Sequence, residues 1–217
     1  MDLIIEGGLY HIEQFFVVDK PKSFHVAIHP YKISFHKNTY VGPIVSTRFP
    51  KTVFSFRSYS NIKSGSSKHD APLFDSITTI VDFNDSRMKE DVVVKGNRNI
   101  HLLLEDLKTK LQCVLWDPYC HQVHNVIEKL KNTSGGYPVV IIQLCRAKIM
   151  RGEIGVSNTL YATKIVVDQQ VEEIVEYISK LPDNDLVKTY SGSQLSNSYV
   201  LSVKRRITVC LMYFYDS

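Results

Sequence analysis

The chain has 217 residues, 44% of them apolar and 22% charged, which is typical of a packed, soluble fold of one large domain or two small ones. No apolar run approaches the roughly 18 residues that span a bilayer, and the N-terminal MDLIIEGGLY lacks the basic and apolar regions of a signal peptide. The four cysteines form no CxxC pair, so we expect reduced thiols in an intracellular protein with no membrane partner.

The net charge of +4 is small, but its distribution is uneven. Between Lys20 and Lys68 the sequence holds nine Lys or Arg, eight aromatic residues and no Asp or Glu. Cations interleaved with aromatic rings suit a polyanion that carries stackable bases. The alternative for each single residue is an aromatic in the core or a lysine at its rim.

The first part of the chain predicts strands and no helix. Residues 9–18 and 31–41 are rich in β-branched and aromatic residues, and 51–56 is a shorter candidate. Two or three strands make a poor free-standing domain. We therefore interpret residues 1–63 as a partial domain and the polar segment 64–72 as a linker.

The next part predicts three strands, the last two of which form a hairpin. Residues 73–83 read as a strand, 92–98 as a strand end with its turn, and 99–106 and 110–116 as a β-hairpin. Asp117 and Pro118 then suit the start of a helix, because Asp is a favoured N-cap and Pro is favoured at the first helical position.

The last part of the chain predicts two further strands and a second helix. The helix is expected to end at Ser134–Gly136. We then expect two long strands, over 137–150 and 153–167, joined by a turn at Arg151–Gly152. A closing amphipathic helix is expected over 171–181. Three strands, a helix and two strands is the order of the OB-fold, a five-stranded Greek-key barrel. We therefore predict an all-β protein with minor α content, comprising a complete OB-fold over 73–182, a partial copy over 1–63, and an irregular tail over 183–217.

The single tryptophan stands on the unexpected side of its strand. Side chains alternate between faces along a strand, so Trp116 does not share a face with the apolar residues Leu111, Cys113 and Leu115. The alternative is a core tryptophan. Alternation favours an indole on the open barrel face, where it can stack on a nucleobase.

The strand over 137–150 shows the same separation. Alternation places Arg146, Lys148 and Met150 on one face, leading to Arg151 at the turn. A solvated face is the ordinary interpretation of such charges, but continuity with Trp116 favours contacts to phosphates. Met150 offers a flexible, polarisable thioether that can lie against a base. Lys95 and Arg98, which flank Gly96, are equally consistent with a solvated turn and with phosphate binding.

Other chemistry finds little support in the sequence. His121 and His124 lie near Cys120 on the predicted helix, but no distant pair completes four zinc ligands, so we predict a helix surface and no metal. The sequence holds no P-loop, GxGxxG or Ser-His-Asp arrangement and no convergent acidic pair. We expect neither an enzyme, nor a cofactor, nor a small-molecule substrate.

Two segments carry a resemblance to a known family. NRNIHLLLEDLKTKLQCVLWDPYCHQV and PVVIIQLCRAKIMRGEIGVSNTLYATKIVVD resemble the single-stranded-DNA-binding OB domains of the replication protein A large subunit, especially its plant versions. GLYHIEQFFVVDKPKSFHVAIHPYKISFHKNTYV resembles the second half of the preceding OB domain of that subunit. The resemblance covers roughly residues 7–180.

The resemblance implies a nuclear protein without catalytic activity that coats single-stranded DNA in replication, repair and recombination, together with smaller partner subunits. In the family two aromatics stack on bases; Trp116 occupies one of these positions, and Met150 stands at the other. The alternative is an OB-fold that serves as a protein-interaction module, or binds RNA, with weakened DNA affinity. Met150 and the incomplete first barrel favour that alternative.

Overall fold

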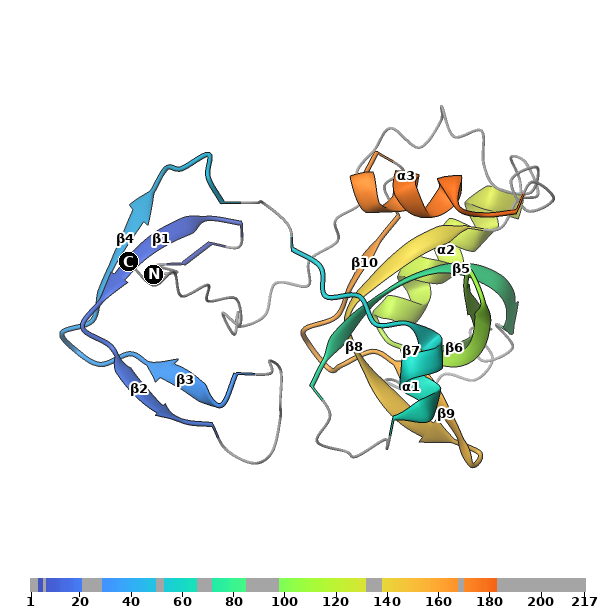
Figure 1. Cartoon of the computed structure of the whole chain (residues 1–217), viewed down its shortest axis with the longest axis horizontal. Coiled ribbons are helices and arrows are strands. Elements are labelled where there is room, and N and C mark those ends of the chain that lie inside the picture. The colour runs from blue at the N-terminus through green and yellow to red at the C-terminus, as the bar shows by residue number, and fades with distance from the viewer. Residues whose placement is uncertain are drawn as a thin grey trace. The chain divides into compact units, whose positions relative to one another are not determined.

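The computed structural model (Figure 1) describes residues 4–5, 7–20, 29–49, 53–65, 72–84, 98–131, 138–167 and 170–182. These residues form two compact units, one ending at Phe54 and the other beginning at Ser55. The predicted tail over 183–217, most of the predicted strand over 92–98 and most of the linker over 64–72 lie outside the described residues. Within the described part, no helix is long and apolar enough to cross a membrane.

The first unit consists of two antiparallel strand pairs. β1 (Leu9–Glu13) pairs with β4 (Tyr40–Ile44), and β2 (Phe16–Asp19) pairs with β3 (Tyr31–Ser34). The predicted strands are thus each split in two, at Gln14, which has a φ of 54°, and around Thr39, whose hydroxyl donates to the Gln14 carbonyl at 2.8 Å. Large side chains of these strands, including Phe16, Tyr31 and Tyr40, are exposed. The assignment of this unit as a partial OB-fold stays a prediction.

The second unit is a closed five-stranded barrel. Its strands are β5 (Phe74–Asn84), β6 (Asn99–Asp106), β7 (Thr109–Trp116), β8 (Val139–Met150) and β9 (Glu153–Ser157). They pair in the circular order β5–β6–β7–β9–β8–β5, and β7–β9 is the one parallel pair of the barrel. With α2 (Tyr119–Lys131) between β7 and β8, this is the OB-fold topology. The predicted fold is confirmed.

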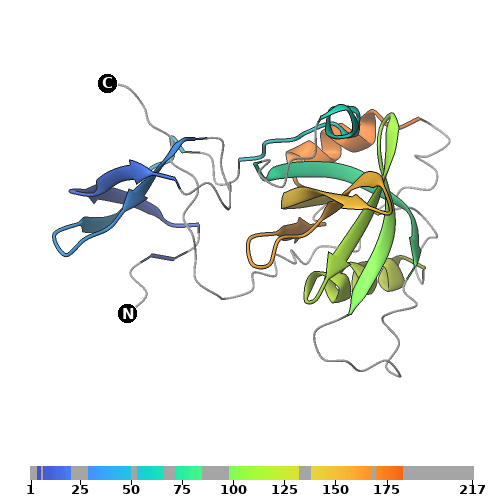
Figure 2. The same ribbon diagram turned by 90° about the horizontal axis from the view of Figure 1, so that it is seen from below.

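Helices close both ends of the barrel (Figure 2). α2, which follows the end of β7, contributes Val123 and Ile127 to the core. α1 (Tyr59–Ser64) lies at the other end and contributes Tyr59 and Ile62. Between the helices, the inward side chains of the strands fill the interior, among them Leu102, Leu104, Leu111, Leu115, Val140 and Ile142.

α1 is a helix that the sequence does not predict, and it moves the start of the barrel unit. The Tyr59 hydroxyl lies 2.7 Å from Ser76 Oγ, and the Tyr59 amide donates to Asp106 Oδ2 at 2.6 Å. Burial raises the pKa of Tyr59, so the phenol is neutral and acts as a hydrogen-bonding core residue. Residues 55–63, which we assigned to the first domain, belong to the same compact unit as the barrel, and this unit begins at Ser55.

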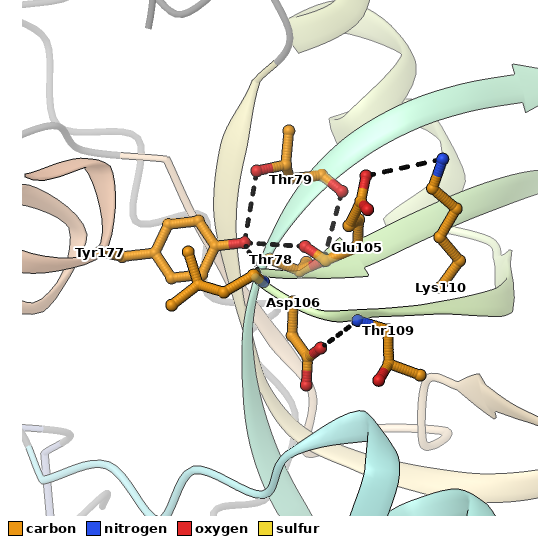
Figure 3. Close-up of polar contacts among 8 residues, drawn as sticks. Thr78, Thr79, Glu105, Asp106, Thr109, Lys110 and Tyr177 are labelled. Carbon is orange, nitrogen blue, oxygen red and sulfur yellow. Dashed lines mark hydrogen bonds and ion pairs between the residues drawn. The ribbon is translucent and has the colours of Figure 1, made fainter. Parts of the chain in front are cut away.

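The closing helix α3 (Glu172–Ser179) buries Ile174 and Tyr177, and Tyr177 also hydrogen-bonds to the barrel (Figure 3). The Tyr177 hydroxyl donates to the Glu105 carbonyl at 2.7 Å and accepts from the Leu107 amide at 3.4 Å. Thr79 Oγ1 lies 3.3 Å from the same hydroxyl. One buried phenol thus fixes α3 to β5 and to the turn between β6 and β7.

β8 contains a bulge at Leu144, which has a φ of 54°. Phe74 pairs with Cys145 and Ser76 with Ile142, so two steps on β5 match three on β8. Because one residue is inserted, the inward positions change from even to odd numbers: Val140 and Ile142 are core residues before the bulge, and Cys145 is one after it.

Two side chains hold this bulge. Asp75 is buried, and its carboxylate accepts from the Leu144 amide at 2.8 Å and from the Ser55 amide at 2.7 Å. Thr163 Oγ1 donates to the Leu144 carbonyl at 2.9 Å. Burial raises the pKa of Asp75, while the two amide hydrogen bonds lower it. Asp75 thereby connects the segment before α1 to the point where β8 changes its alternation.

Replacing Asp75 by Asn tests this connection. The amide of Asn offers one oxygen, so either the Ser55 or the Leu144 N–H faces an NH2 group and loses its acceptor. We expect a loss of about 1–3 kcal/mol in the free energy of unfolding, measured by urea denaturation. Asp82→Asn, an exposed change on the same strand, is the control and should stay within about 0.5 kcal/mol. Equal stability of the two variants contradicts the role given to Asp75.

Candidate nucleic-acid interface

The strand register places the predicted residues on one outer face of the barrel. Val114 on β7 lies beside Ser157 on β9, and Ser157 pairs with Arg146 on β8. Laterally paired residues point to the same side of a sheet. The β7–β9–β8 face therefore carries every second residue of three adjacent strands: Gln112, Val114 and Trp116; Gly155 and Ser157; Arg146, Lys148 and Met150.

Trp116 and Lys148 contact each other across this face. The ammonium of Lys148 lies 5.7 Å from the centroid of the indole ring, within the range of a cation–π interaction. β9 lies between their two strands, so the contact crosses over β9. Trp116 is half-buried, whereas Leu111, Cys113 and Leu115 are buried in the core. The structure thus places the indole outside the core, beside a cation.

Met150 lies over a glycine at the far part of the same face. A Cβ on Gly155 would come within 2.0 Å of the Met150 methyl carbon and within 2.5 Å of the Gln112 carbonyl oxygen. The absence of a side chain at Gly155 therefore allows Met150 to lie flat on β9 and allows β7 to approach closely. The thioether forms an apolar floor at the position where the family resemblance places an aromatic ring.

The turn between β8 and β9 is set by backbone conformation. Arg151 and Gly152 have φ values of 52° and 87°, as expected for the two central residues of a type I′ hairpin turn. The predicted turn is confirmed, and it holds the exposed Arg151 side chain at the tip of the hairpin. This tip continues the line from Arg146 through Lys148.

The cations of this face are available for a ligand. Arg146 and Arg151 are exposed, Lys148 is half-buried, and none of the three forms an ion pair with another described residue. The exposed Glu153, paired with Met150, contributes one negative charge at the hairpin end. The net charge of the face is therefore positive, and it can attract phosphate groups.

The remaining predicted cations are not brought to this face. Arg98 directs its guanidinium at the ring of His121 on α2, with Nη1 3.2 Å from Nε2. Its neighbour Asn99 pairs with Trp116, and alternation sends the Arg98 side chain to the other side. Lys95 lies outside the described residues.

Arg98 belongs to a compact polar cluster at the start of α2. Asp117 Oδ1, the Cys120 thiol and His121 Nε2 all lie within 4.8 Å of one another. This set offers three ligand atoms from the described residues, whereas a structural zinc site uses four. Burial, with Asp117 nearby, raises the pKa of Cys120 to about 12. The thiol donates to Asp117 at 3.1 Å, and the Arg98 cation lies beside His121. The cluster therefore forms hydrogen bonds that fix the start of the helix.

The structure adds two residues that the sequence does not single out. Asn158, at the end of β9, accepts the Trp116 amide hydrogen on Oδ1 at 2.8 Å and fixes the end of β7. Ser157 is fully buried under the face, and its hydroxyl has no hydrogen-bond partner among the described residues. Sequence alone signals neither role, since both depend on the parallel pairing of β7 and β9.

No family model and no curated protein matches the chain. A chain of a replication protein A heterotrimer bound to single-stranded DNA is similar over 82% of this chain and 39% of its own length, with 16% identity and a TM-score of 0.49. Schizosaccharomyces pombe Pot1pC bound to the single strand CGGTTACGGT is similar over 50% of this chain and 87% of its own, with 14% identity and a TM-score of 0.34. The chain thus spans about two-fifths of the replication protein A chain.

Replacing Gly155 by Ala tests the packing of the face. The new methyl group displaces Met150 and presses against the Gln112 carbonyl oxygen, which belongs to the backbone of β7. We expect a loss of about 1–3 kcal/mol in the free energy of unfolding, as is usual for overpacking. Adding Met150→Ala removes only the side-chain clash, so a double variant as stable as Met150→Ala alone would contradict the close approach of β7.

Proposed function

We propose that the β7–β9–β8 face binds single-stranded DNA. The observation that carries this proposal is the Lys148 ammonium 5.7 Å from the Trp116 ring, on a face that also presents Arg146 and the nearby Arg151 without ion-pair partners in the described chain. A stacking ring beside phosphate-binding cations is the combination that sequence-tolerant binders of single strands use.

On binding, the contact between Lys148 and Trp116 is replaced by two new contacts, one between Trp116 and a base and one between Lys148 and a phosphate. In the free protein Lys148 lies over the indole, an interaction of about 0.5–1 kcal/mol at an exposed site. A nucleobase stacked on the ring contributes roughly 1–3 kcal/mol. The displaced ammonium then meets a phosphate of the same strand, where it releases condensed counterions. The exchange favours the bound state without any change in the barrel.

At the level of the whole protein, we propose a role like that of the replication protein A large subunit. The resemblance of residues 7–180 supports a nuclear protein that acts in DNA replication, repair and recombination together with the smaller subunits. Binding is the proposed activity, without catalysis. Binding of RNA and of another protein by the same face are the outcomes against which the proposal is tested.

Removing the indole tests the stacking step. Trp116→Ala should weaken the binding of a labelled oligo-dT of about 20 nucleotides by about 5- to 150-fold, corresponding to one stacked base. Since Trp116 is the one tryptophan, its fluorescence in the natural chain should be quenched in the same titration. The same titration is made with an oligo-rU of equal length, and tighter binding of oligo-rU than of oligo-dT would show that the face prefers RNA. No binding of either strand at low salt would refute the proposal.

Removing cations tests the phosphate contacts. Affinity for a single strand falls with salt with a logarithmic slope of about 0.7 per phosphate neutralised, so Arg146→Gln and Arg151→Asn should each lower the slope by about 0.7. Asn is chosen at 151 because it tolerates the left-handed turn conformation found there. Lys180→Gln, at the C-terminal cap of α3, is the control and should leave the slope unchanged. Equal slopes in all variants contradict phosphate contacts at this face.

A further inference from the structure

The loop that follows β9 lies next to Trp116. β9 runs parallel to β7, with Ser157 beside Val114, and the next residue, Asn158, accepts the Trp116 amide hydrogen. The chain then leaves the sheet over residues 158–163 and returns to the same edge of β8 as β10 (Lys164–Val166). This loop therefore begins beside Trp116, the residue for which we propose base stacking on the β7–β9–β8 face.

The loop is held rigid by its own hydroxyl groups. Thr159 N–H donates to Thr163 Oγ1 at 2.8 Å, and the amides of Ala162 and Thr163 donate to Thr159 Oγ1 at 3.1 and 3.0 Å. Thr163 Oγ1 in turn donates to the carbonyl of Leu144, the bulged residue of β8. Such side-chain bonds replace sheet pairing and fix the loop to the barrel.

At its tip this rigid loop presents two large apolar side chains to solvent. Leu160 is 71% exposed and Tyr161 60% exposed. An exposed ring held on an ordered loop loses little conformational freedom when it binds a ligand. Exposed apolar side chains beside a binding face mark a contact surface rather than a packing requirement.

The surroundings of Tyr161 define the class of ligand. The chain from Ile154 to Val167 holds no Asp or Glu, and the loop begins at Asn158, which is hydrogen-bonded to the backbone of Trp116, the one tryptophan of the protein. We propose that Tyr161 is a second base-stacking residue, which receives a nucleobase next to the one on Trp116. This inference rests on the proposed function and extends it to a part of the chain outside the β7–β9–β8 face.

The test compares four full-length chains in the oligo-dT titration: the natural sequence, Tyr161→Ala, Tyr161→Phe and Val175→Ala. Tyr161→Ala should weaken binding by about 5- to 150-fold, whereas Tyr161→Phe keeps the ring and should stay within about twofold of the natural chain. Val175→Ala removes an equally exposed apolar side chain on α3 and should have no effect. The salt slope of Tyr161→Ala should be unchanged, because no charge is lost.

Photo-cross-linking provides the direct readout. An oligo-dT that contains 5-iododeoxyuridine should form an adduct on the tryptic peptide 152–164, in which Tyr161 is the one aromatic residue. If the natural chain binds but Tyr161→Ala binds equally well, or if this peptide forms no adduct, the inference is wrong and the proposed function stands. If the natural chain does not bind, both fall.

Discussion

The arrangement of the barrel's outer face depends on the extra residue in β8 at Leu144. Without it, the even-numbered residues that point inward at Val140 and Ile142 would continue inward, and Arg146 and Lys148 would meet the core. The inserted residue reverses the alternation. Asp75 on β5 accepts a hydrogen bond from the Leu144 amide, and Thr163, at the end of the 158–163 loop, donates one to the Leu144 carbonyl. Two buried side chains thus keep the cations on the surface, and the same interruption marks where the 158–163 loop leaves the sheet.

This bulge also places a cation beside Trp116, the residue for which we propose base stacking, because it keeps Lys148 on the outer face. Trp116 would expose a wide apolar ring on a flat three-stranded face, and such a face invites association with other chains. The Lys148 ammonium lies over the ring in the free protein and keeps a charge beside it. The interaction is weak enough to be exchanged for a base and a phosphate. In the proposed binding mode, the side chains of the free face therefore need to rearrange only at Lys148.

The elements that sequence predicts well are those whose signals are local. The alternation of 99–106 and 110–116, the Arg151–Gly152 turn and the amphipathic pattern of α3 each depend on neighbouring residues, and the structure confirms them. α1 was missed because six residues give little periodicity, and its place is set by distant partners, Ser76 and Asp106. The long strand expected over 153–167 is interrupted because Asn158, Thr159 and Thr163 satisfy backbone groups with their own side chains.

In the candidate site, too, sequence predicts what depends on neighbouring residues and misses what depends on distant ones. Alternation within Gln112–Trp116 and Arg146–Met150 is enough to sort the residues of each strand, but only the parallel pairing of β7 and β9 shows that the two sets share a face. Arg98 illustrates the opposite case: its position in the sequence suits a phosphate contact, yet its guanidinium is directed at His121. Met150 fills the space above Gly155 as a flat thioether, which leaves Trp116 without an aromatic neighbour on the sheet. The second stacking ring that we propose, Tyr161, comes from outside the sheet, on the loop that begins at Asn158 beside the Trp116 backbone.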